Sequence, residues 1–101
     1  MKINGKDIKF EYTIGAMCDY NDHIAKNPNI SLARAQVYEA LYMNRAYAQA
    51  HGGDEVTLEE IMSLPGSMYQ SLMDEVKAAK DTGNERSVEA VEKKQNINRR
   101  K

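Results

Sequence analysis

Residues 1–17 read MKINGKDIKFEYTIGAM, and within this stretch the spacing of the apolar side chains changes from a strand period to a helix period. Asn4-Gly5 is the strongest short-range signal for a β-hairpin, because a type I′ turn needs a positive φ at both central residues. Closing the chain on this turn sets three pairs of residues opposite each other: Ile3 and Lys6, Lys2 and Asp7, Met1 and Ile8. One face of a hairpin over residues 1–12 is then apolar. We expect this face to pack on helices, because a lone hairpin is only marginally stable in water.

Helical spacing begins after Thr13, which can cap a helix over residues 14–25. Asn27-Pro28 ends this helix, since the residue before a proline avoids the helical region. Five side chains at helical spacing form its expected inner face: Ile14, Met17, Cys18, Asn21 and Ile24. This pattern predicts that the single cysteine is a core residue.

The longest predicted helix covers residues 32–51. Ser31 precedes it as an N-cap, and Gly52-Gly53 follows it as a C-cap pair. Its expected core stripe consists of four apolar side chains: Leu32, Val37, Leu41 and Ala48. This helix is long enough to organise the packing of the other elements.

Two shorter helices are predicted after this one. Thr57 and Glu60 have the spacing of a capping box, in which the N-cap hydroxyl and the acid three residues later satisfy each other's backbone donors. Pro65-Gly66 interrupts the chain, and Ser67 is the expected cap of a fourth helix. That helix places four apolar side chains on one face: Met68, Leu72, Met73 and Val76.

These elements predict a mainly α (α+β) fold, in which an N-terminal β-hairpin packs on a three- to four-helix domain over residues 1–80. A flexible, polar and charged tail is expected over residues 81–101. Its last nine residues hold five basic side chains and no acidic one. One domain is also what a chain of 101 residues has room for.

Bulk composition excludes some classes of protein. No stretch approaches the roughly 18 apolar residues of a membrane-spanning helix, and no signal-peptide pattern follows Met1. The single cysteine is typical of a reducing, cytoplasmic environment. The 14 basic and 15 acidic residues give a net charge of −1, which argues against a dedicated nucleic-acid-binding protein.

No combination of residues in the sequence has the spacing of a catalytic or metal site. His23 and His51 lie near the ends of predicted helices, where the helix dipole favours them, and neither has metal-type spacing to another ligand. Cys18 is five residues from His23, which places the two on different sides of a helix. Asp19 and Asp22 fall on the predicted polar face. The sequence therefore predicts a protein that is not an enzyme and binds neither a cofactor nor a metal.

Tyrosine and methionine supply much of the bulky apolar surface, since the chain has six of each, one Phe and no Trp. Five of these residues form a candidate partner-binding face: Tyr38, Tyr42, Met43, Tyr47 and Tyr69. Both residue types are enriched at protein interfaces. The simpler interpretation, a core boundary with hydroxyl groups reaching water, remains open beside it.

The hairpin sequence Lys2-Ile3-Asn4-Gly5-Lys6 and the strand-to-helix passage over residues 8–16, IKFEYTIGA, resemble the start of the small tail assembly chaperones of long-tailed bacteriophages. The order of elements, the chain length and the helix start Thr57-Leu58-Glu59-Glu60-Ile61 are also similar to that family. The resemblance covers residues 1–80 in pattern. It implies a non-enzymatic protein of the bacterial host cytoplasm that binds the tape measure protein and tail tube subunits during tail assembly. It also implies self-association into a homo-oligomer.

Two other classes of function remain as alternatives. A small phage or bacterial regulatory protein would bind DNA through the basic tail and a helix, in a salt-dependent manner. A structural head–tail joining component would be present in finished virus particles, whereas an assembly chaperone would not.

Overall fold

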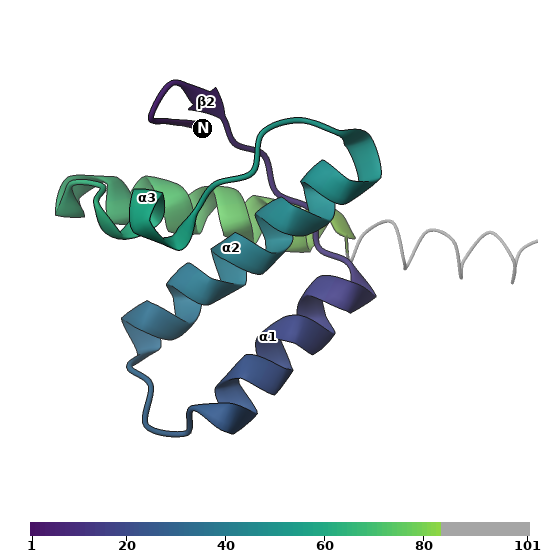
Figure 1. Ribbon diagram of the computed structural model, residues 1–101, viewed down its shortest axis with the longest axis vertical. Helices are drawn as coiled ribbons and strands as arrows, with labels where there is room; N and C mark the ends of the chain where they lie inside the picture. Colours follow the sequence, from purple (N-terminus) through teal and green to yellow (C-terminus); the bar gives the residue numbers. More distant parts are fainter. Residues whose placement is uncertain (84–101) are drawn as a thin grey trace, which may run out of the picture.

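The chain begins with a two-stranded antiparallel hairpin, β1 (Lys2–Ile3) and β2 (Lys6–Asp7), in the computed structural model, which describes residues 1–83 (Figure 1). Asn4 and Gly5 have φ values of 53° and 78°, the positive values that a type I′ turn requires. The predicted register is confirmed, with Lys2 opposite Asp7 and Ile3 opposite Lys6.

The hairpin is shorter than predicted, because residues 8–13 leave it as an extended segment without a strand partner. Met1 and Ile8 close the ladder through two backbone hydrogen bonds of 2.8 Å. Beyond them the Glu11 amide donates to the carbonyl of Met43 at 3.1 Å, so this segment runs against a helix and not against a strand.

Helices α1 (Ile14–Lys26) and α2 (Leu32–His51) form an antiparallel pair joined by a short loop (Figure 1). Both begin at the predicted caps: Thr13 Oγ1 accepts from the Ala16 amide at 3.0 Å and Ser31 Oγ from the Arg34 amide at 3.2 Å. α2 has the predicted bounds and ends at Gly52, whose φ is 75°. α1 continues one residue beyond its predicted end.

The second half of the described chain contains α3 (Leu58–Met62), the 3-10 turn η1 (Gly66–Met68) and a helix over residues 69–83. This helix crosses behind α2 (Figure 1). Ser67 is not the helix cap predicted for it. The Met68 amide instead donates to the carbonyl of Pro65 at 2.9 Å, which winds Ser67 into the 3-10 turn. The helix also continues through residues 81–83, which were predicted to belong to the tail. The rest of that predicted tail lies outside the described residues.

The hydrophobic core lies between α2, the hairpin and the helix over residues 69–83, and it confirms the apolar face predicted for the hairpin. Its most completely buried large side chains are Ile3, Ile8 and Leu72, each no more than 2% exposed. The mainly α architecture, with an N-terminal hairpin packed on helices, is therefore as predicted.

The inner face of α1 differs from the prediction. Ile14 and Met17 are 77% and 40% exposed, and Cys18 is exposed and not a core residue. Ala16 is the buried residue of α1, and His23 lies seven positions along the same face, where its ring stacks on Tyr38 of α2. The small Ala16 side chain and this ring stacking turn the helix so that the predicted apolar stripe faces outward.

Asn44 is a buried polar side chain at the centre of the fold, with no exposed surface. Its Nδ2 donates to the carbonyls of Lys9 at 2.9 Å and Asp54 at 3.3 Å, and its Oδ1 accepts from the Val56 amide at 2.8 Å. One side chain of α2 thus holds two non-helical segments, which otherwise have few regular backbone partners. No helix within residues 1–83 combines the length and apolar composition needed to cross a bilayer.

Candidate partner-binding site

An open apolar groove of about 260 Å³ lies between the first half of α2, α3, the turn after α3 and the helix over residues 69–83. We call it the apolar groove. It is lined by Ser31, Ala33, Arg34, Val37, Ile61, Met62, Leu64, Pro65, Gly66, Tyr69 and Leu72. Arg34 is the one formally charged side chain in this lining.

The groove has a buried floor, and one of the large apolar side chains that line it is exposed. Val37, Ile61 and Leu72 form the floor and belong to the hydrophobic core. Met62 is 47% exposed in the lining, and Leu32, whose chain neighbours Ser31 and Ala33 line the groove, is 75% exposed. When a partner covers exposed apolar side chains, the free energy falls, because apolar area is removed from water.

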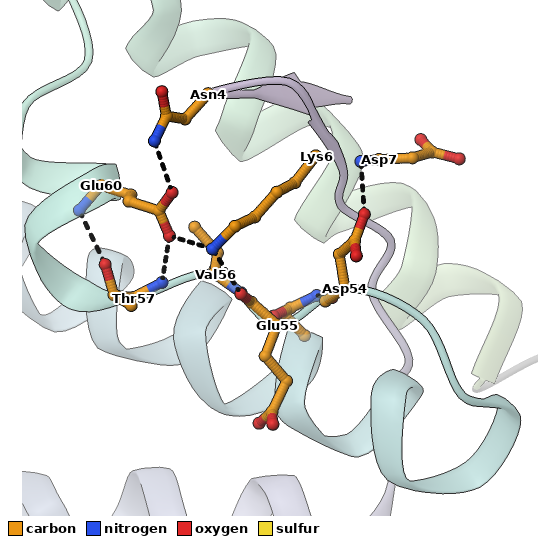
Figure 2. A network of polar contacts seen from close by, with 9 residues as sticks. Asn4, Lys6, Asp7, Asp54, Glu55, Val56, Thr57 and Glu60 are labelled. Carbon is orange, nitrogen blue, oxygen red and sulfur yellow. Dashed lines mark hydrogen bonds and ion pairs between the residues drawn. The ribbon is translucent and has the colours of Figure 1, made fainter.

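The α3 wall of the groove is held in place by a polar network centred on Glu60 (Figure 2). One carboxylate oxygen accepts from Lys6 Nζ at 2.9 Å and from the Thr57 amide at 3.0 Å, and the other accepts from Asn4 Nδ2 at 3.0 Å. Lys6 also donates to the carbonyl of Glu55 at 3.3 Å. The hairpin turn is therefore tied to the start of α3, and α3 carries Ile61 and Met62 into the groove.

The same contacts make this carboxyl group more acidic. The hydrogen bond from Lys6, followed by those from Asn4 and the Thr57 backbone, lowers the pKa of Glu60 from 4.5 to about 2. Since the folded-state pKa lies below the ordinary value, the network contributes its full stability above pH 4.5 and loses this contribution as the pH falls toward 2.

We expect a Glu60→Gln variant to be less stable than the wild type at pH 7, because glutamine keeps the capping geometry but loses the charge facing Lys6. The difference should shrink as the pH falls from 4.5 toward 2, where the wild-type carboxylate itself becomes protonated. Urea unfolding followed by circular dichroism over this pH range measures it. Glu59→Gln, an exposed neighbour in the same helix, is the matched control. A constant difference between wild type and Glu60→Gln across this range would contradict the proposed origin of the shift.

The five residues predicted to form one partner-binding face are distributed over several places. Tyr69 lines the apolar groove, and its hydroxyl donates to Gln36 Oε1. Met43 is 2% exposed and lies in the core, so we leave it out of the proposed surface. Tyr47 packs on His51 at the far end of α2, with 4.6 Å between ring centroids.

Tyr38 and Tyr42 lie at the interface between α1 and α2. The Tyr38 ring stacks on His23 with 3.8 Å between centroids, and Tyr42 Oη is 3.3 Å from His23 Nδ1. Both tyrosines also pack against the hydrophobic core. Replacing both with alanine would therefore disturb the α1–α2 pair as well as any partner contact, so this double variant cannot separate binding from folding.

Both histidines lie in the last turn of a helix, as predicted. Each also contacts side chains from another part of the chain. His51 Nε2 is 3.0 Å from a carboxylate oxygen of Glu11, and the His23 ring contacts the rings of Tyr38 and Tyr42 in α2. Within residues 1–83, no three side chains of His, Cys, Asp or Glu converge in a way that would hold a metal ion.

The exposure of two apolar residues was missed in the sequence, because Leu32 was placed in a core stripe and Met62 was given no surface role. A helix of five residues between two irregular segments cannot bury all of its apolar side chains, and this was the available signal for Met62. Comparison with protein-family models, curated proteins and solved structures found no match to this chain. Its function is therefore inferred from the groove and from the resemblance of its first residues.

Proposed function

We propose that this chain is a non-enzymatic tail assembly chaperone of a long-tailed bacteriophage, which binds apolar helical segments of the tape measure protein. The observation that carries the proposal is the apolar groove, with a core floor and with Met62 exposed in its lining. Leu32, an exposed apolar residue at the start of α2, is next in the chain to two residues of the lining. The resemblance of residues 2–16 to the start of such chaperones supports the same assignment.

The shape of the groove favours a helix as its occupant. An amphipathic helix that lies in a groove inserts apolar side chains spaced three, four and seven residues apart. A volume of about 260 Å³ accommodates roughly one or two large side chains, since an apolar cavity of roughly 150 Å³ holds a benzene ring. The contact is therefore small and apolar, which suits a reversible complex that is released when the tail is assembled.

A long helical protein needs such a partner while it waits for assembly. Apolar stripes that are later buried in the tail are exposed at this stage and promote aggregation. A chaperone with a small groove covers one stripe per copy, and several copies along the chain keep it soluble. Tail tube subunits are a second class of client in the same proposal.

Coexpression tests the proposal directly. We expect the tape measure protein encoded beside this chain to precipitate when it is expressed alone, and to remain soluble and copurify with the chain when both are expressed. Finished particles should lack the chain, because a chaperone leaves the assembled tail. A tape measure protein that shows no binding at chain concentrations of about 100 μM would contradict the proposal. Recovery of the chain in finished particles would favour a structural joining component instead.

A further inference from the structure

A second, polar hollow of about 430 Å³ lies beside the apolar groove, at the loop between α1 and α2. We call it the basic hollow, after its three ionisable nitrogen groups on His23, Lys26 and Arg34. Tyr38 and residues 27–30 complete its lining. Among the described residues, no acidic side chain lines it.

Arg34 belongs to both surfaces, because it lines the apolar groove as well as the basic hollow. Within residues 1–83, neither the Arg34 guanidinium nor the Lys26 ammonium has a hydrogen-bond or ion-pair partner. Other cations of the fold do have one: Lys6 binds Glu60 at 2.9 Å and Lys80 binds Glu39 at 3.1 Å. Because Arg34 lines both, the apolar groove and the basic hollow adjoin each other, and the face that they form is apolar on one side and positively charged on the other.

The position of Arg34 in α2 is unfavourable for the helix itself. It is the third residue of α2, where the positive end of the helix dipole disfavours a cation. The equivalent position in α3 is Glu60, which completes a capping box with Thr57. Ser31 would allow the same capping box in α2 if residue 34 were glutamate. The stability of α2 thus gives no reason for an arginine at this place, whereas recognition of a negatively charged partner does.

We infer that the partner segment is an acidic amphipathic helix, whose apolar side chains enter the apolar groove while neighbouring carboxylates bind Arg34 and Lys26. The inference rests on the proposed function and names the chemistry of the segment that the chaperone selects. A guanidinium pairs with a carboxylate through two parallel hydrogen bonds, so Arg34 would fix the orientation of the helix as well as add attraction. Charge complementarity of this kind selects between partners with similar apolar stripes.

Two synthetic helical peptides test the inference, with the same leucine stripe but flanked by glutamate in one and by lysine in the other. We expect the wild-type chain to bind the glutamate peptide at least about tenfold more tightly than the lysine peptide at low salt, measured by fluorescence polarisation. The preference should weaken as the salt concentration rises, because salt screens exposed charges. Equal affinities for the two peptides would overturn the inference, as would no binding of the glutamate peptide at about 1 mM.

Arg34→Glu separates recognition from folding. We expect this variant to lose the preference for the glutamate peptide and to prefer the lysine peptide, while its melting temperature stays equal to or above that of the wild type. Lys77→Glu makes the same change of net charge at an exposed position in the helix over residues 69–83, and is the matched control. An Arg34→Glu variant with unchanged peptide preference would overturn the inference.

Different results contradict the acidic-partner inference and the chaperone proposal. A wild-type chain that captures the tape measure protein but binds both peptides equally contradicts the acidic partner and agrees with the chaperone proposal. A wild-type chain that prefers the glutamate peptide but captures no tape measure protein keeps the acidic helix as the ligand and removes the assigned client.

Discussion

Replacing Asn44 with alanine is expected to lower the free energy of unfolding by about 3 kcal/mol and the melting temperature by about 15 °C. The side chain is fully buried, and its removal leaves the Val56 amide and the carbonyls of Lys9 and Asp54 without their partners. A buried polar group without a partner costs about 1–3 kcal/mol, which sets the size of the effect. Chemical denaturation followed by circular dichroism measures it.

Two further variants show whether hydrogen bonding, and not side-chain volume, is responsible. Asn44→Asp keeps the volume, but its second carboxylate oxygen would face two backbone carbonyls, so we expect a loss at neutral pH at least as large as for alanine. Asn21→Ala, on the exposed surface of α1, should change the stability by less than about 0.5 kcal/mol. If Asn44→Ala were destabilising by less than about 1 kcal/mol, the network would not be organising the fold as described.

Replacing Leu32 and Met62 together with glutamine is expected to weaken binding of the tape measure protein about 100-fold while leaving the fold intact. Both side chains are substantially exposed, at 75% and 47%, so the unbound fold loses little when they become polar. In the proposed complex the partner covers Met62 in the groove and Leu32 beside it, so the variant loses about 1–2 kcal/mol of apolar contact at each position. Glutamine leaves the charge of the surface unchanged, so the result reports on the apolar contact alone. Titration calorimetry with a soluble tape measure segment measures the affinity.

The chain contains a matched control for this variant. Ile14 and Met17 form a second exposed apolar pair, on α1, at 77% and 40% exposure. Neither residue lines the apolar groove, and neither is next in the chain to a residue that does. We expect their double replacement with glutamine to leave the affinity unchanged. A loss of binding in the Ile14/Met17 variant, with none in the Leu32/Met62 variant, would move the binding surface to α1.

Local signals in the sequence predicted the secondary structure well. Asn4-Gly5 predicted both the turn and the strand register, because positive φ angles are accessible to few residues and the hairpin register follows from the turn. Thr13 and Ser31 predicted the starts of α1 and α2, since a cap satisfies amide groups within one turn of itself. Each of these signals acts between residues that are near each other in the chain.

The buried face of α1 could not be predicted from such local signals. Periodicity predicted an inner face that included Ile14 and Cys18, but the inner face is the one with Ala16 and His23. Which face is buried depends on the partner helix: Tyr38 of α2 offers a ring on which His23 stacks, and Ala16 allows close approach. The ring on which His23 stacks belongs to α2, so the sequence of α1 itself does not identify it.

The sequence by itself determined the hairpin turn with its register, the starts of α1, α2 and α3 at their caps and the capping role of Glu60. Each of these depends on contacts within a few residues. Tertiary structure decided that Glu60 also binds Asn4, 56 residues away, and that Arg34 lies between an apolar groove and a basic hollow. The physical reason is that a groove is the space left between packed helices. Its position depends on helix orientations, which many weak long-range contacts set together.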